Sequence, residues 1–319
     1  MPVRLLILAP YRTLEGFREF QASRHLLAGL DSRGIAWERR QPWQPMDDLA
    51  NFDAVLCWTY RHTWGDHLLW AGRVEERCAA LGLAVVNPSA RFTYLHSPDL
   101  EAWARHGVRA PACQRFAELA EIRLSYPLVL RRDSEHRGRR MVRAESPEEA
   151  REAVARDFAE AGEAGGGRPL DLAVEFVDTR WPDGFYRKRR AYVAGGEVIP
   201  AHAVRSRDWI VNFGSRADEM GSYREDRRFL EEGEPQAGLV RQAAAVLGAD
   251  LAALDYSPAP DGSYVFWEAN RNPRMWGDKE LGVGKPRAAD RLLGEALADL
   301  VLRRVEEAGR RSPFPRPGE

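Results

Sequence analysis

The stretch "LDYSPAPDGSYVFWEANRNP", residues 254–273, decides the fold of this chain. Two largely apolar segments flank Pro-Ala-Pro-Asp-Gly, a composition typical of a tight turn, so the stretch predicts a β-hairpin. Asp255 lies on the first strand, and Glu268 and Asn270 lie near the end of the second. Positions 268 and 270 share a face because side chains alternate along a strand. Pairing about the turn would bring three oxygen ligands together.

Carboxylates with one amide oxygen form a ligand set that suits Mg²⁺, which also keeps waters and substrate phosphates in its octahedral shell. We therefore predict a metal site at Asp255, Glu268 and Asn270, with Mn²⁺ as an alternative ion. A second interpretation stays open, in which Asp255 only ends a strand, Glu268 pairs with an arginine and Asn270 begins the next turn.

Composition narrows the classes of protein. A length of 319 residues suits about two domains of ~150 residues each, and 44% apolar content can supply their cores. The formal net charge of −1 gives no basic field to attract nucleic acid or an anionic membrane, so we expect a small-molecule or peptide substrate. The cationic side chains are almost all arginine, and the only lysines are Lys188, Lys279 and Lys285.

The cysteines and the N-terminal stretch point to the cytoplasm. Cys57, Cys78 and Cys113 are odd in number and widely spaced, which predicts neither a disulfide framework nor a zinc site. The opening "MPVRLLILAP" stops at a proline without a cleavage signal, and no stretch approaches the ~20 apolar residues that span a bilayer. We therefore expect a cytoplasmic location, and the oligomeric state is not predicted.

Apolar strands alternate with helical patterns over the first 90 residues, which predicts a parallel α/β sheet. The first strand is followed by "APYRTLEG" and not by G-x-G-x-x-G, so the dinucleotide fingerprint of a Rossmann dehydrogenase is missing. The predicted strands are residues 3–10, 35–40, 53–60 and 83–88, and the predicted helices are residues 15–32 and 66–82.

Beyond residue 91 the pattern becomes a mixture of hairpins and helices, which predicts α+β lobes. A helix begins at Ser146, where "SPEEA" supplies a cap, a proline and acidic first-turn residues. The other predicted elements are helices or helical regions at 93–106, 225–248 and 287–308, and strands at 127–132, 139–144, 170–177, 185–206 (turning at Gly195 and Gly196), 251–257 and 263–270.

The stretch 254–273 resembles the C-terminal metal-binding signature of the ATP-grasp superfamily, whose members include RimK-like ligases. The resemblance implies an ATP-grasp fold with ATP and Mg²⁺ bound between two α+β lobes. It also implies a Rossmann-like pre-ATP-grasp domain over residues 1–90, a first lobe over 91–175, and a second lobe with the metal site and the C-terminal helix over 176–319.

Two segments of the first lobe resemble parts of the family's nucleotide site. In "YPLVLRRDSEHRGRRMV" the usual phosphate-binding lysine position falls at Arg131, with Arg132 as the competing choice, and Gly138 would let the loop approach the phosphates. "LAVEFVDTR" resembles the hinge, which implies that backbone groups of Glu175, Phe176 and Val177 bind adenine. Asp178 or Asp183 would then take the ribose hydroxyls.

"FYRKRRAYVAGGEVIPAHAVRS", residues 185–206, resembles the family's R-x-x-V-x-G-G hairpin. Alternation places Lys188, Arg190 and Tyr192 on one face. We expect Arg190 and Arg205 to contact a phosphate or an acyl phosphate. His202 would face the same cleft or serve as a structural hydrogen-bonding residue.

The sequence departs from the family before the helix of the first lobe. Many members carry another phosphate-binding lysine there, whereas this chain reads "YLHSPDLEAWARHGVRAP". Either His96 substitutes for the lysine, or the helix N-terminus after Ser97 binds the anion, or the contact is absent.

Other candidates concern the substrate. Arg271 and Arg274 would hold an acyl phosphate or a substrate carboxylate, and the alternative for each is a salt bridge with a nearby acid. An aromatic group after the third strand would line a pocket or cover a domain junction, and a later segment would add a second wall. The first group is Trp58, Tyr60, Arg61, His62 and Trp64, and the second is Arg207, Asp208, Trp209 and Asn212.

The first functional hypothesis is therefore an ATP- and Mg²⁺-dependent ligase that joins a carboxylate to an amine, with an amino acid or a peptide as substrate. The second hypothesis is a nucleotide-binding protein without turnover that acts as a regulator or assembly partner, and the third is a kinase of a small molecule. The missing lysine favours the second, and the set Asp255, Glu268 and Asn270 favours the first.

Overall fold

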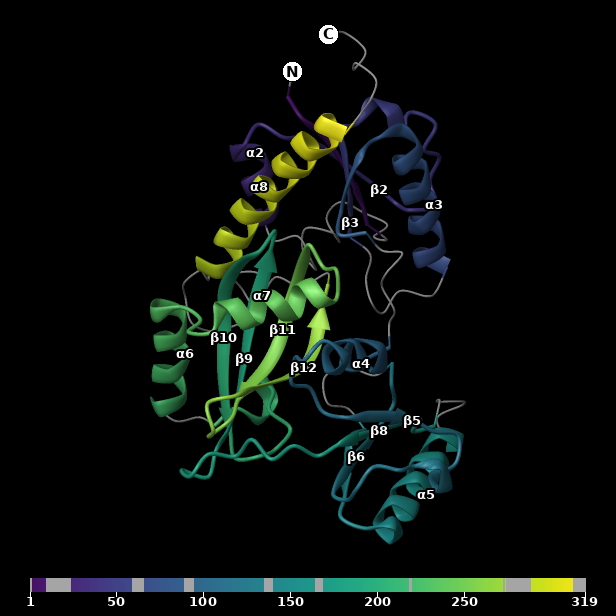
Figure 1. Cartoon of the computed structure of the whole chain (residues 1–319), viewed down its shortest axis with the longest axis vertical. Coiled ribbons are helices and arrows are strands. Elements are labelled where there is room, and N and C mark those ends of the chain that lie inside the picture. The colour runs from purple at the N-terminus through teal and green to yellow at the C-terminus, as the bar shows by residue number, and fades with distance from the viewer. Residues whose placement is uncertain are drawn as a thin grey trace.

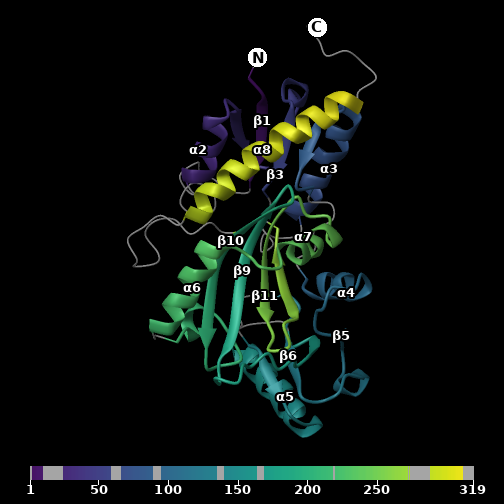
Figure 2. The same cartoon turned by 60° about the vertical axis from the view of Figure 1, so that its left-hand side comes forward.

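The structure is a computed structural model that describes residues 2–9, 24–58, 66–88, 95–134, 140–163, 169–217, 220–271, 273 and 288–311. Within these ranges the chain forms three four-stranded sheets with helices packed on them, arranged along the long axis of the molecule (Figures 1 and 2). The predicted mixed α/β class is confirmed. None of the described helices is long and apolar enough to cross a membrane.

The N-terminal sheet is parallel and has the strand order β2-β1-β3-β4. Its two central strands are almost entirely buried, as expected for strands that are covered on both faces. The elements are β1 (Arg4–Leu8), α2 (Arg24–Ser32), β2 (Ala36–Arg40), β3 (Ala54–Cys57), α3 (Asp66–Leu81) and β4 (Ala84–Val86), with a short 3₁₀ helix at Leu49–Asn51.

The second sheet is antiparallel, has the order β5-β8-β6-β7, and carries α5 on one face. The helix α5 begins as predicted, because the Ser146 hydroxyl accepts a hydrogen bond from the Glu149 N–H at 3.2 Å. The elements are α4 (Ser97–Arg105), β5 (Cys113–Arg115), β6 (Leu128–Arg131), β7 (Val142–Ala144), α5 (Pro147–Glu163) and β8 (Leu172–Glu175), with a 3₁₀ turn at Leu119–Glu121.

The third sheet is also antiparallel, with the order β10-β9-β11-β12. Its first hairpin turns at Gly195 and Gly196, whose φ angles of 55° and 88° suit glycine. The predicted helical region 225–248 is two helices, because the chain breaks at Gly233, where φ is 88°. The elements are β9 (Tyr186–Ala194), β10 (Glu197–Ser206), a 3₁₀ turn (Phe213–Ser215), α6 (Met220–Glu232), α7 (Ala237–Val246), β11 (Leu251–Pro258), β12 (Tyr264–Asn270) and α8 (Ala288–Arg311).

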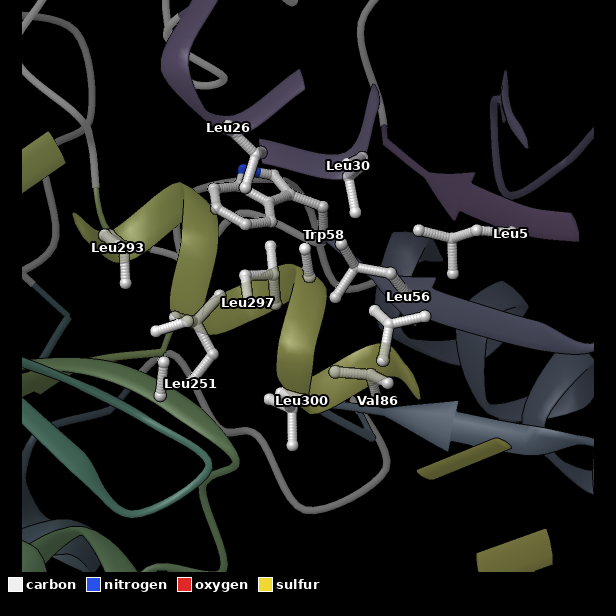
Figure 3. Packing of buried hydrophobic residues seen from close by; sticks show 14 of the residues in the cluster. Leu5, Leu26, Leu30, Leu56, Trp58, Val86, Leu251, Leu293, Leu297 and Leu300 are labelled. Carbon is white, nitrogen blue, oxygen red and sulfur yellow. The ribbon is translucent and has the colours of Figure 1, made fainter. Parts of the chain in front are cut away.

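The last helix, α8, joins the N-terminal sheet to the third sheet. Its apolar side fills a single hydrophobic cluster with residues of β1, β3 and β4 on one side and of β9, β10 and β11 on the other. Figure 3 shows Leu297 and Leu300 of α8 in one cluster with Leu56 of β3, with Trp58 directly after that strand, and with Leu251 of β11. The two sheets therefore share one core and pack as one body.

The helix α4 precedes the second sheet in sequence but packs on the third. Trp103 is fully buried against Phe266 of β12, with ring centroids 5.6 Å apart, and its indole N–H donates to the Ala243 carbonyl of α7 at 2.8 Å. Leu100 joins the same cluster. The chain from about residue 108 to 177, which holds the second sheet and α5, is thus the part that projects from this common body (Figure 1).

The helices α2 and α8 cross with their backbones in contact. A Cβ atom added at Gly29 would lie 2.4 Å from the backbone of Gly294, and one added at Gly294 would lie 2.3 Å from the carbonyl oxygen of His25. Real Cβ atoms do not approach other atoms so closely, so glycine at both positions permits the crossing.

The crossing predicts a strong effect of one methyl group. Gly29→Ala should lower the free energy of unfolding by about 1–3 kcal/mol or more through overpacking. Gly72→Ala on α3 is the matched control, since an added Cβ there has no atom within 4 Å, and it should be neutral or stabilise by up to about 1 kcal/mol. Urea unfolding measures both variants, and equal midpoints would mean that the two backbones do not touch.

Candidate nucleotide and metal site

The three predicted metal ligands lie together on one face of the third sheet. Asp255 of β11 pairs directly across from Glu268 of β12, and Ala253 pairs with Asn270. Because side chains at 253 and 255, and at 268 and 270, point to the same face, Asp255, Glu268 and Asn270 project on one side of the hairpin. Glu268 and Asn270 are partly exposed, whereas Asp255 is only 4% exposed.

A β-bulge at Trp267 produces this arrangement. Between the turn and the bulge the register pairs Tyr256 with Phe266, and beyond it Asp255 pairs with Glu268, so Trp267 is the extra residue. Without the bulge, continuing that register would pair Asp255 with Trp267 and turn Glu268 toward the core under α7. The indole N–H of Trp267 donates to the Ser257 hydroxyl at 2.8 Å, which anchors the bulge on the same face as Asp255.

Two cationic side chains of β9 hold Asp255. Arg190 donates from Nε to Oδ1 at 2.5 Å and from Nη2 to Oδ2 at 2.8 Å, and Lys188 donates from Nζ to Oδ2 at 3.3 Å. Burial alone would raise the pKa of Asp255, but the charges of Arg190 and Lys188 outweigh it and leave that pKa below its ordinary value. Sequence reasoning placed Lys188 on this face but did not choose it as a site residue.

The opposite face of the hairpin is fixed by a buried polar cluster. Tyr256 and Tyr264 stack at 5.2 Å, and both hydroxyls donate to the carboxylate of Glu234, whose side chain is 1% exposed. Arg189 donates to the Tyr264 hydroxyl at 2.8 Å. Burial, reinforced by the charge of Glu234, raises the pKa of Tyr256 well above its ordinary value, so the phenol stays protonated. This cluster joins β9, β11 and β12 on the face opposite the candidate metal ligands.

The structure places Arg205 on the opposite face of the sheet from Arg190, which does not fit the expectation that both contact a phosphate. A second bulge, at Ala201, shifts the register of β10 so that Arg205 pairs with Arg187 on the face that α6 covers. There Arg205 donates to Glu225 of α6 at 3.0 Å and stacks over the Phe185 ring at 3.7 Å. The same shift brings His202, which is 3% exposed, directly opposite Arg190.

The two candidate arginines at the end of β6 point to opposite faces of the second sheet. Arg131 shares its face with Val129, away from α5, and pairs across from Leu172 of β8. Arg132 instead donates to Asp157 of α5 at 3.1 Å, with both side chains largely buried. Of the two, Arg131 is therefore the one on the face away from α5, while Gly138 lies outside the described residues.

The N-terminus of α4 is already occupied by a carboxylate. Asp133 is fully buried and accepts hydrogen bonds from the N–H groups of His96 and Ser97, at 2.7 and 2.8 Å, and from the Ser97 hydroxyl at 2.6 Å. Anion binding by these backbone donors was one of three alternatives, and in the structure the donors bind Asp133. His96 is 1% exposed, and its backbone helps tie the end of β6 to α4.

The hinge leaves one backbone donor open. Glu175 donates its N–H to the Ala112 carbonyl at 2.8 Å, and Phe176 donates to the Pro127 carbonyl at 3.3 Å. Within the described ranges no hydrogen bond involves the N–H of Val177. Of the two ribose candidates, Asp183 is held by Arg187, which lowers its pKa to about 2, and Asp178 pairs with Arg180 at the surface.

An apolar face lies beside the hinge. Val129, Leu172 and Val174 form it on the side of the second sheet away from α5. Phe176 packs against this face and meets Trp209 edge-on, with ring centroids 5.8 Å apart. Trp209 comes from the loop after β10, so this loop packs against the apolar face of the second sheet. Its neighbour Arg207 lies against Phe185 instead.

Arg271 forms a salt bridge, which was the alternative interpretation of this residue. It donates from Nη2 to Asp99 of α4 at 2.9 Å, with side chains only 10% and 8% exposed. The Arg271 carbonyl also accepts a hydrogen bond from the Asn87 side chain at 2.6 Å, and Asn87 in turn binds Asp250 and Leu251. These contacts fix the end of β12 to α4 and to the end of β4.

The predicted aromatic pocket is described only in part. Trp58 is fully buried in the cluster around α8, which fits the interpretation that it covers a junction. Asp208 and Asn212 make hydrogen bonds inside their own loop. Four residues of this group lie outside the described residues, namely Tyr60, Arg61, His62 and Trp64. Arg274 also lies outside them.

The donor set suits a hard divalent cation. The described residues contain no group of three or more histidine, cysteine, aspartate and glutamate side chains placed to hold a metal ion. Carboxylates and an amide oxygen on one face are ligands of the type that Mg²⁺ takes.

No protein-family model matches the sequence, and no curated protein matches it. The structure is similar to that of D-alanine–D-alanine ligase from Bacillus anthracis, with a TM-score of 0.56 and 14% identity over 97% of this chain and 100% of that chain. The same enzyme complexed with ATP gives 0.57 at 13% identity over the same shares. A RimK domain protein from Sphaerobacter thermophilus, described as ATP-grasp, gives 0.54 at 19% identity, over 94% of this chain and 100% of that one. Likeness at these identities establishes the fold.

The two arginines of β6 should differ in their effect on stability. Arg132→Ala should cost about 3 kcal/mol of unfolding free energy, the lower end for a broken buried pair, because Arg140 still contacts Asp157 at 3.2 Å. Arg131→Ala should cost clearly less, since its side chain lies on the face away from α5 and not in the pair with Asp157. Denaturant unfolding of both variants measures this, and a larger loss for Arg131→Ala would reverse the assignment of faces.

Proposed function

We propose that this chain, which has the ATP-grasp fold, is an ATP- and Mg²⁺-dependent ligase that activates a carboxylate as an acyl phosphate for attack by an amine. The observation that carries the proposal is the placement of Asp255, Glu268 and Asn270 on one face of the β11–β12 hairpin. An amino acid or a peptide-like molecule is the proposed substrate.

The nucleotide would lie between the second and third sheets. At the hinge, the open N–H of Val177 suits an acceptor nitrogen of adenine, and the apolar face of Val129, Leu172 and Val174 suits the flat base. Phe176 and Trp209 would border the base on one side. The ribose would then reach Asp178, which is the more exposed of the two candidate acids.

The phosphates would lie toward the metal ligands. Arg131 approaches them from the second sheet, and Lys188 and Arg190 approach from β9. Bound Mg²⁺, held by Glu268 and Asn270 with Asp255 beside them, would neutralise charge on the phosphate oxygens. Phosphoryl transfer depends mainly on positioning and on charge stabilisation, both of which this arrangement of cations can provide. No covalent nucleophile of the protein is required.

A second candidate function is nucleotide binding without turnover. It is favoured by the N-terminus of α4, where no lysine stands near Ser97 and Asp133 takes the backbone donors. A site with one phosphate contact fewer would bind ATP but stabilise the transition state less. ADP release in the presence of mixed carboxylates and amines distinguishes this candidate from the ligase.

Mg²⁺-dependent binding tests both candidates. Thermal melting with ATP, ADP or GTP, with and without Mg²⁺, should show a shift for adenine nucleotides with Mg²⁺, worth about 2.7 kcal/mol at 100 times Kd. Glu268→Ala should melt normally without ligand and lose the shift. Glu231→Ala, which removes an exposed carboxylate of α6, is the control and should keep it. An undiminished shift in Glu268→Ala would remove the metal assignment.

Arg131 should act on phosphate and not on the base. Arg131→Ala is expected to weaken ATP by about tenfold or more, the loss of roughly one charged hydrogen bond worth 1.5–3 kcal/mol. Adenosine, which lacks phosphate, should bind the variant and the native protein alike. Calorimetry with both ligands decides the point, and an equal loss for adenosine would place Arg131 elsewhere.

A further inference from the structure

The carboxylate of Asp255 is largely saturated by side chains of the protein itself. Arg190 occupies one position on each oxygen, and Lys188 occupies another on Oδ2. The side chain of Asp255 is 6% exposed, and those of Lys188 and Arg190 are 20% and 15% exposed. Metal coordination by Asp255 would require at least part of this bidentate pair to open, at the cost of leaving a buried guanidinium without its partner.

The charges of the cluster lead to the same result. Asp255 and Glu268 are balanced by Lys188 and Arg190, so these four side chains carry no net formal charge. One divalent cation would give the cluster a charge of +2. A site that had the same two carboxylates and two divalent cations, but no cationic side chain, would also carry a net charge of +2. Lys188 and Arg190 therefore supply the charge that a second metal ion would supply, and a second ion beside them would be repelled.

Residue 188 is also unusual for this chain. Of the 47 cationic lysine and arginine side chains only three are lysine, and Lys188 is the only lysine among the described residues. An ammonium is a compact charge with three rotatable donors, whereas a guanidinium is a planar fork. Lys188 can keep one donor on Asp255 and turn the others toward a phosphate oxygen.

Building on the proposed function, we propose that the site takes one divalent cation, held by Glu268 and Asn270, and that Lys188, anchored on Asp255, replaces the second cation at the phosphates. Asp255 is then a positioning residue for Lys188 and Arg190. Glu268 and Asn270 differ from Asp255 in being partly exposed on the same face of the hairpin.

The test counts metal ions. Full-length protein is loaded with Mn²⁺ and a non-hydrolysable ATP analogue, separated from free ligand, and analysed for bound Mn²⁺ by EPR and for bound nucleotide by absorbance. The native protein should hold one Mn²⁺ per bound nucleotide. Glu268→Gln should weaken Mn²⁺ by more than about tenfold, since even outer partners of a metal site are worth 10–100-fold.

Lys188→Ala is the decisive variant, because it removes one cation and frees part of Asp255. It should bind the analogue more weakly at low Mn²⁺ and take up a second Mn²⁺ at high Mn²⁺, which restores affinity. Arg227→Gln, a loss of one exposed positive charge on α6, is the control and should keep a single ion. Asp255→Asn should still bind a single Mn²⁺ if the variant folds. If it does not fold, the number of Mn²⁺ ions per nucleotide in the native protein tests the proposal.

The outcomes separate the two proposals. Two Mn²⁺ per nucleotide in the native protein would overturn this inference and leave the proposed function standing. A single Mn²⁺ in both native protein and Lys188→Ala, with unchanged nucleotide affinity, would also overturn it, because Lys188 would then not act at the phosphates. Absence of any bound Mn²⁺ with nucleotide would overturn both proposals.

Discussion

The ion pair between Arg190 and Asp255 is the contact on which the candidate site depends. A carboxylate that is almost completely buried must be compensated, and here the compensation comes from the neighbouring strand and not from a distant loop. The pair therefore fixes β9 against β11, while Tyr256, Tyr264 and Glu234 fix the same strands from below. Glu268 lies where it does because its strand is held in this frame.

The third sheet, which carries the candidate metal ligands, packs firmly on the N-terminal sheet, whereas the second sheet is a separate body beside it. The third sheet shares its core with the N-terminal sheet through α8, and α4 packs on it through Trp103. The second sheet carries Arg131 and the hinge, and it meets this body at a few contacts, among them Asp133 on α4 and Phe176 on Trp209. The groups that would bind a nucleotide thus come both from the second sheet and from the larger body formed by the N-terminal and third sheets.

Much of the fold and part of the candidate site could be predicted from the sequence, because the alternation of side chains and the composition of turns are local signals. They predicted the hairpin, the shared face of Glu268 and Asn270, and the mixed α/β class. The two bulges were not predictable, since an extra residue such as Trp267 or Ala201 leaves no trace in composition yet moves every later side chain to the other face. One bulge brings Glu268 to Asp255, and the other takes Arg205 away. The salt bridges of Arg132 and Arg271 depend on residues far along the chain, which a local pattern cannot reveal.

The position of α8 has a consequence for the order in which the protein is made. The ribosome completes β1, β3 and β4 early, but many of the side chains that cover them, such as Leu293, Leu297 and Val301, belong to α8 and are translated after every strand described here. Domains usually fold in turn as they emerge. Until residues 288–311 have been synthesised, α2 is the one described helix that packs on this face, so part of the apolar surface of the first sheet stays in contact with water during translation.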